Sequence, residues 1–145
     1  MRMVFLNLPV SDLGASRAFY AGLGFAFNDQ FSDERTTSVV VDENIVVMLL
    51  TREKFAGFTK RPIADAHATV QTLLCLSADS REHVDSIVDA AAAAGGAADP
   101  NPKQDYGFMY GRSVEDPDGH IWEIMWMDPA AAEQGPEGYA AKEST

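Results

Sequence analysis

The order of the secondary-structure signals repeats once along the chain, and this repetition limits the possible folds more than any other feature of the sequence. The first half has a strand pattern over residues 3 to 10, and Asp12 is suited to cap the helix that follows. That helix is predicted to end at Gly24, because glycine is the usual residue just past a helix C-terminus. Two runs of β-branched and aliphatic residues, 36 to 41 and 45 to 50, then predict a hairpin.

The second half repeats this order after a polar connection at residues 51 to 69, which shows no periodicity. Its predicted elements are, in chain order, a strand over 70 to 77, a helix capped by Asp79 or Ser80, and a hairpin of strands 107 to 114 and 120 to 127 joined by the turn DPDG. The chain therefore reads as a duplicated α+β unit. Each half alone would expose one face of its sheet, so we expect the two halves to curl around a common cavity.

Length and composition indicate one globular domain. A chain of 145 residues can bury about two-thirds of its unfolded surface in a single domain. We expect this domain to span residues 1 to 128, with modules at about 1 to 50 and 70 to 128 on either side of a linker. Residues 129 to 145 are small and polar, and we expect them to form a partly ordered C-terminal tail.

Charge and cysteine content exclude several classes of partner and site. The chain has 11 basic and 22 acidic residues, and its net charge of −11 would repel a phosphate backbone, so we expect no nucleic acid partner. The single cysteine, Cys75, cannot form an internal disulfide or a multi-cysteine metal site. The longest apolar run, 45 to 50, is too short for a membrane span, and the first residues lack the pattern of a secretory signal. We therefore expect a cytoplasmic protein that binds no membrane.

One carboxylate, Glu123, interrupts the apolar strand that follows the DPDG turn. Side chains alternate along a strand, so Glu123 shares a face with Met125, and His120 lies on the opposite face. Both faces are largely apolar, which predicts that both are covered. A carboxylate on such a face must be paired with a cation, bound to a metal, protonated, or wetted by a cavity, because unpaired burial is costly.

Two roles for Glu123 stay open. It can be a pocket carboxylate that binds a cation or acts as a base, or it can be salt-bridged to Arg112. Cys75 can face the same cavity, but no histidine lies beside it in the sequence to activate a thiolate, so a small core residue is the simpler interpretation. Trp122 and Trp126 lie on the other face, and we expect them to pack under the helices or at a dimer contact.

Two stretches carry a family resemblance: LPVSDLGASRAFYAGLGF near the start and DYGFMYGRSVEDPDGHIWEIMWMD near the end. In this order around a duplicated pattern, they resemble the vicinal oxygen chelate superfamily, which includes glyoxalase I, extradiol dioxygenases and the bleomycin resistance proteins. The resemblance spans residues 3 to 128. It implies two βαβββ modules that form a U-shaped, barrel-like mixed sheet, commonly in a homodimer, with a ligand pocket inside.

The resemblance also implies metal-ligand positions, one on the first and one on the last strand of each module. In this sequence these positions hold Glu123, which matches, and the apolar residues Phe5, Met48 and Leu73. A divalent ion needs several converging oxygen, nitrogen or sulfur donors, so we expect no metal cofactor. A slip of register would add only the amides of Asn7 and Gln71, which with one carboxylate still make a poor site.

The expected function is the binding of a small organic molecule in the cavity without the usual metal, as in sequestration of a drug or metabolite. The resemblance also admits an enzyme, either a lyase, an isomerase or a dioxygenase, that uses Glu123 as a base or as a metal ligand. A third possibility is a module that mainly binds a partner chain. An acidic chain suits a cationic or neutral ligand, and methionine side chains form deformable pockets. The expected ligand-binding residues are Phe5, Asn7, Met48, Gln71, Leu73, Met109, Tyr110, Arg112, Glu123 and Met125.

Overall fold

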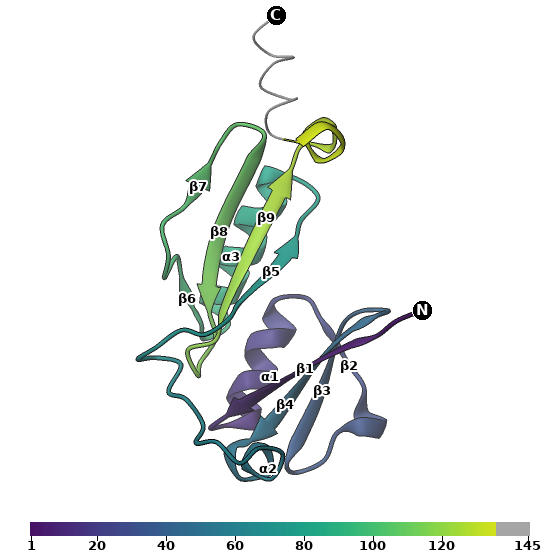
Figure 1. The fold of residues 1–145 in the computed structure, drawn as a ribbon, viewed down its shortest axis with the longest axis vertical. Helices are drawn as coiled ribbons and strands as arrows, with labels where there is room; N and C mark the ends of the chain where they lie inside the picture. The colour runs from purple at the N-terminus through teal and green to yellow at the C-terminus, as the bar shows by residue number, and fades with distance from the viewer. Residues whose placement is uncertain (136–145) are drawn as a thin grey trace, which may run out of the picture.

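The structure is a computed structural model that describes residues 1–135, and its element order confirms the predicted duplication (Figure 1). The first module consists of β1 (Val4–Val10), α1 (Leu13–Gly22), β2 (Ala26–Phe27), the short 3-10 helix η1 (Asp29–Phe31), β3 (Thr36–Asp42) and β4 (Ile45–Thr51). The second module consists of β5 (Leu73–Ser77), α3 (Arg81–Ala93), β6 (Ala97–Ala98), β7 (Gln104–Asp105), β8 (Met109–Glu115) and β9 (Ile121–Met127). A short helix, α2 (Arg52–Ala56), begins the linker between them.

Local sequence signals explain where the two long helices begin. The Asp12 side chain accepts a hydrogen bond from the backbone N–H of Ala15, and the Ser80 side chain accepts one from His83. Each bond satisfies an N–H group that has no partner within the helix. The first cap is the predicted one, and of the two candidates for the second helix the structure uses Ser80. Gly24, just past the end of α1, has a φ of 89°, which explains why glycine stands there.

Each module builds its own mixed sheet. The strand order is β1-β4-β3-β2 in the first sheet and β5-β9-β8-β6 in the second, with β7 also paired to β8. The first and last strands of each module, β1 with β4 and β5 with β9, are parallel, and the other pairs are antiparallel. This is the predicted pair of βαβββ modules. Within the described residues the two sheets stay separate and neither closes into a barrel.

One helix covers one face of each sheet, and a single core joins the modules. Helices α1 and α3 contact each other, and each packs on the strands of its own module. At the centre the buried Tyr20 hydroxyl donates to Asp116 Oδ2 at 2.8 Å and accepts from Trp122 Nε1 at 2.9 Å. Burial raises the pKa of both Tyr20 and Asp116. Trp122, only 1% exposed, is therefore a core residue under the helices, as one of the two expectations held.

The face of each sheet that lies opposite its helix, here called the open face, is only partly covered. The open face of the first sheet includes Phe5, which is 57% exposed, and that of the second includes Leu73, which is 48% exposed. Figure 1 shows α3 on one side of β5, β8 and β9 and no helix on the other. The prediction that both faces of the Glu123 strand are covered is therefore wrong for this chain taken singly.

The linker and the start of the tail each contain structure that the sequence did not predict. Residues 52–56 form helix α2, although the linker shows no helical periodicity, because Thr51 caps this single turn through its side chain. Residues 129–135 are helical, and Ala131 is 1% exposed, so the start of the predicted tail is packed; residues 136–145 lie outside the described part. No helix within residues 1–135 has the length and hydropathy of a membrane-spanning segment.

Candidate functional site

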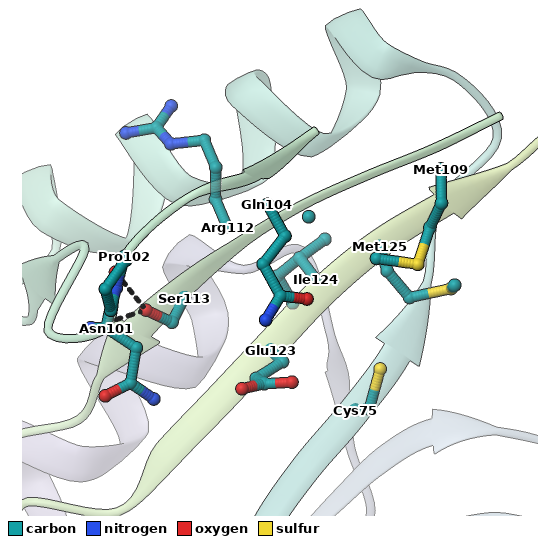
Figure 2. Close-up of a pocket in the computed structure, with 11 residues that line it drawn as sticks. Cys75, Asn101, Pro102, Gln104, Met109, Arg112, Ser113, Glu123, Ile124 and Met125 are labelled. Carbon is teal, nitrogen blue, oxygen red and sulfur yellow. Dashed lines mark hydrogen bonds between the residues drawn. The ribbon is translucent and has the colours of Figure 1, made fainter. Parts of the chain in front are cut away.

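The Glu123 carboxylate lies at a pocket of about 210 Å³ on the open face of the second sheet. Figure 2 shows its floor on β8 and β9 and its side wall in the chain between β6 and β7. The DPDG turn makes this placement possible, because Gly119 takes a φ of 92° and returns the chain directly into β9. We call this the Glu123 pocket; its lining residues are Cys75, Asn101, Pro102, Gln104, Met109, Gly111, Arg112, Ser113, Glu123, Ile124 and Met125.

The strand register brings the pocket residues to one face. Glu123 on β9 is opposite Cys75 on β5 and Ser113 on β8, so these side chains share the open face. Met125 lies opposite Gly111, and the missing side chain of this glycine leaves room above the sheet. Figure 2 shows the Glu123 carboxylate directed into this space, on the side where Gln104 and the sulfur of Cys75 lie.

Glu123 is half-buried, and no cationic side chain among residues 1–135 lies beside it. Within residues 1–135 its carboxylate makes no hydrogen bond or ion pair. Every described side-chain polar atom that is fully buried has a hydrogen-bond partner, so the partnerless oxygens of Glu123 are not fully buried and reach solvent. Of the predicted ways to compensate a carboxylate on an apolar face, the structure uses wetting by a cavity. Glu123 is therefore free to receive a ligand group.

Arg112 is not the partner of Glu123, which corrects one of the two predicted roles. Its side chain lies on the helix-covered face, where its Nε and Nη2 donate to the two Asp99 oxygens at 3.0 and 2.6 Å. Its Nη1 donates to Asp85 at 3.0 Å. The Arg112 hydrogen bonds hold the pKa of the Asp99 carboxyl below its usual value. Figure 2 shows the guanidinium directed away from the Glu123 carboxylate, so Arg112 contributes only its inner part to the pocket wall.

Tyr110 is also on the helix-covered face. Its hydroxyl donates to Asp85 at 2.7 Å, and the Arg81 guanidinium lies over its ring at 4.5 Å from the centroid. Strand alternation puts Tyr110 and Arg112 on one side of β8 and Met109, Gly111 and Ser113 on the other. The prediction of Tyr110 as a ligand-binding residue therefore placed it on the wrong face.

The predicted ligand-binding residues divide among separate places. Met109, Glu123 and Met125 meet in the Glu123 pocket. Phe5 and Met48 lie on the open face of the other sheet, and Leu73, although on the same sheet as Glu123, does not line its pocket. Asn7 and Gln71 line a different pocket between the modules. The single cavity that was expected to unite all these residues is thus not formed by the described part of one chain.

Several lining residues were not predicted. Gly111 and Ser113 could have been found by applying strand alternation from Met109, since all three share a face. Asn101, Pro102 and Gln104 come from an irregular segment with no periodic signal. Asn101 is held against β8, because its backbone N–H donates to the Ser113 hydroxyl at 3.0 Å. No pattern in the sequence indicates this contact between segments.

The residues at the family's metal-ligand positions do not fit a divalent ion. Phe5, Met48 and Leu73 offer no hard donor, and the first two lie on the sheet that lacks Glu123. In the described part of the chain no three His, Cys, Asp or Glu side chains come together in a group that could hold a metal. Cys75 is beside Glu123, but burial and then the Glu123 charge raise the pKa of its thiol, which disfavours the thiolate a metal requires.

Known structures share this fold. A hypothetical protein from S. aureus is 24% identical with a TM-score of 0.73, over 87% of this chain and 94% of that one. A glyoxalase-related enzyme from Fulvimarina pelagi is 23% identical with a TM-score of 0.73, over 87% of this chain and 88% of that one. A glyoxalase/bleomycin resistance protein/dioxygenase family enzyme from Burkholderia phytofirmans PsJN is 21% identical with a TM-score of 0.71, over 88% and 99%. Similarity at these identities establishes the fold alone.

The family itself is shown by sequence. No curated protein sequence matches the chain. The sequence profile of one superfamily, however, matches residues 2–124, which include both modules and Glu123. This range agrees with the predicted resemblance over residues 3 to 128. The chain therefore belongs to the Glyoxalase/Bleomycin resistance protein/Dioxygenase superfamily.

Proposed function

We propose that the protein binds a small organic molecule with a cationic group at the Glu123 pocket, without a divalent metal. The observation that carries this proposal is the Glu123 carboxylate, which is half-buried, without a cation in the described residues, and directed into a pocket. Met109 and Met125 beside it offer a deformable apolar surface for the rest of the ligand. The chain's net charge of −11 also favours a cation over an anion.

We propose further that the protein is a homodimer in which a second copy completes this site. The pocket of about 210 Å³ is smaller than the roughly 300–1,000 Å³ usual for ligand sites. Exposed apolar residues on the open faces, Phe5 and Leu73 among them, are the kind that a second copy covers. The open face of a partner's sheet would supply the wall that one chain lacks. A cytoplasmic location stays a prediction.

An enzymatic role would use the same carboxylate as a base. A free carboxylate beside the amide of Gln104 is compatible with proton abstraction from a bound substrate. The only other titratable side chains among the lining residues are Cys75 and Arg112. The Cys75 thiol has a raised pKa, and the Arg112 guanidinium is paired with Asp85 on the opposite face of the sheet. Neither side chain is therefore suited to act as a second catalytic group. Binding without turnover is the simpler proposal.

The test is calorimetric titration with a panel of aromatic amines and quaternary ammonium compounds. We expect at least one member to bind the wild type, and Glu123→Gln to weaken that binding by about tenfold or more. Gly111→Leu, which fills the pocket without changing charge, should have the same effect. Glu82→Gln on α3 removes an exposed carboxylate elsewhere and should leave binding unchanged. Absence of binding by the whole panel, or equal loss in Glu82→Gln, would refute the proposal.

A further inference from the structure

A second and larger pocket, of about 420 Å³, lies where the two modules meet. We call it the inter-module pocket. Its walls are formed by residues 6–9 of β1, by the linker between α2 and β5, and by the turn that leads into β9. In Figure 1 this linker runs along the side of the molecule from the lower module to the upper one. The inter-module pocket and the Glu123 pocket share no lining residue.

The walls of this pocket are fixed to both modules. A Cβ atom on Gly119 would lie 2.7 Å from the backbone nitrogen of His67 and 2.8 Å from the carbonyl carbon of Ala66, so the linker rests directly on the DPDG turn. His67 Nδ1 also lies 3.4 Å from the Glu115 carboxylate. On the other side, His120 Nε2 bonds to the Pro9 carbonyl at 2.8 Å and ties β9 to β1. The pocket is therefore a built feature of the fold.

The lining carries no aspartate, glutamate, lysine or arginine. This is unusual for a chain in which 23% of the residues are charged and acidic residues outnumber basic ones by 22 to 11. Large apolar side chains make up much of the wall, and Val70 is 61% exposed there. Binding of a ligand that removes this apolar surface from water is favourable in free energy. Such a lining, largely apolar and with His120 as its one titratable side chain within residues 1–135, favours a neutral and mainly apolar ligand.

A few polar groups can orient such a ligand. Asn7 and Gln71 are among the lining residues, and the side-chain amide of neither makes a hydrogen bond within residues 1–135. The backbone of Asn7 adds a donor and an acceptor. Val4 donates its N–H to Asn44, on the β4 side of β1, whereas the carbonyl of Pro9 bonds to His120 on the other side. Backbone groups alternate in direction along a strand, so Asn7 directs its N–H and C=O to the same side as Pro9 does. This side is the edge of β1 that pairs with no other described strand. These groups suit a ligand with a carbonyl or hydroxyl.

We propose that the inter-module pocket is a second binding site, for a neutral, mainly apolar small molecule that carries a carbonyl or hydroxyl group. Its volume lies in the range of about 300–1,000 Å³ that is usual for small-molecule sites. Like those sites, it combines mainly apolar walls with a few polar groups. The proposal is independent of the function proposed for the Glu123 pocket, because the two pockets share no lining residue and one suits a neutral ligand, the other a cationic one.

The test uses prodan, a neutral naphthalene ketone whose emission shifts to the blue in apolar surroundings. We expect saturable, blue-shifted binding to the full-length protein. Ala64→Trp places a large side chain in the pocket wall and should weaken binding by about tenfold or more. Ala68→Trp is the matched control: it makes the same change on the same linker at an exposed residue that does not line the pocket, and binding should stay unchanged. Thr59→Trp, elsewhere in the pocket wall, repeats the test if Ala64→Trp does not fold.

Cys75→Phe, which fills the Glu123 pocket instead, distinguishes the two sites and should leave prodan binding unchanged. The proposal is overturned if prodan does not bind saturably, if Ala64→Trp and Ala68→Trp bind it equally, or if Cys75→Phe alone abolishes binding. It is also overturned if Ala64→Trp changes the molecular mass in solution and leaves prodan binding intact, because the pocket would then be an interface between chains.

Discussion

Single residues on the second sheet show how strand alternation separates structural charges from available ones. Arg112 and Glu123 belong to neighbouring strands, but Arg112 meets Asp85 and Asp99 on the helix side, and Glu123 meets a pocket on the open side. The Arg112 side chain is 9% exposed and satisfies several charge-assisted hydrogen bonds, so it is a structural residue. Glu123 has no such bonds within residues 1–135 and is the functional candidate.

Replacing Arg112 with methionine should destabilise the fold. We expect Arg112→Met to lower the free energy of unfolding at pH 7 by about 2 kcal/mol, because carboxylates that now accept charged hydrogen bonds lose their donor. Urea denaturation monitored by circular dichroism measures this loss. Glu82→Gln on the exposed surface of α3 is the control and should change little. An unchanged midpoint in Arg112→Met would show that the cluster contributes nothing to stability.

The same cluster predicts the acid dependence of stability. Hydrogen bonding to Arg112 lowers the Asp99 pKa, and hydrogen bonds from Tyr110 and then Arg112 lower that of Asp85, from an ordinary value of 3.8. The native state therefore binds fewer protons than the unfolded state, so this stabilisation is complete above about pH 5 and is lost as the pH falls below 3.8 through the native values. Wild-type and Arg112→Met unfolding curves should converge in acid. A constant difference from pH 7 to pH 3 would contradict this assignment.

At the scale of residues, the sequence predicted what depends on strand parity and failed where distant segments meet. Alternation from the DPDG turn correctly put Glu123 and Met125 on one face and Trp122 on the other. The partners of Arg112 are Asp85 on α3 and Asp99, the residue that follows β6. The local sequence of β8 gives no indication of either contact. The ion pair with Arg112, one of the two roles left open for Glu123, was wrong because it ignored that same parity.

At the scale of elements, α1 lies closely against the segment between α3 and β6, where a glycine leaves space. A Cβ on Gly96 would lie 2.3 Å from Phe19 Cε2 and 2.6 Å from the Glu115 carbonyl oxygen. We expect Gly96→Ala to destabilise the protein by about 1–3 kcal/mol through overpacking. Thermal denaturation of the variant measures the loss. The control is Gly111→Ala, whose Cβ would meet only ordinary contacts, 3.6 Å or more from its neighbours. Equal melting temperatures for the two variants would show that the packing of Gly96 against Phe19 is not tight.

Elements with strong local signals were predictable, and short ones were not. The caps at Asp12 and Ser80 and the hydrophobic strand patterns fixed both long helices and both hairpins. Helix α2 and the strands β6 and β7 have five, two and two residues, too few for a periodic pattern. Their positions depend on packing against the rest of the fold, and one of them leads into the wall of the Glu123 pocket.

At the scale of the whole molecule, the open faces of the two sheets are the surface through which we propose dimerisation. Phe5→Lys puts a charge on the open face of the first sheet, where desolvating it would be costly. We expect the wild type to have the mass of a dimer by light scattering and Phe5→Lys to weaken association by about tenfold or more. Ser86→Lys, on the exposed surface of α3, should remain dimeric. A monomeric wild type, or a dimeric Phe5→Lys, would contradict the proposal.

The central claim is that Glu123 serves an organic ligand and not a metal, and it is tested most directly by thermal melts with added nickel, zinc, manganese and iron. A protein whose other metal-ligand positions hold Phe5, Met48 and Leu73 should show no specific rise in melting temperature with any of these ions. Purified without chelator, it should also contain far less than stoichiometric metal. A rise in melting temperature that Glu123→Gln abolishes would contradict the account and identify Glu123 as a metal ligand.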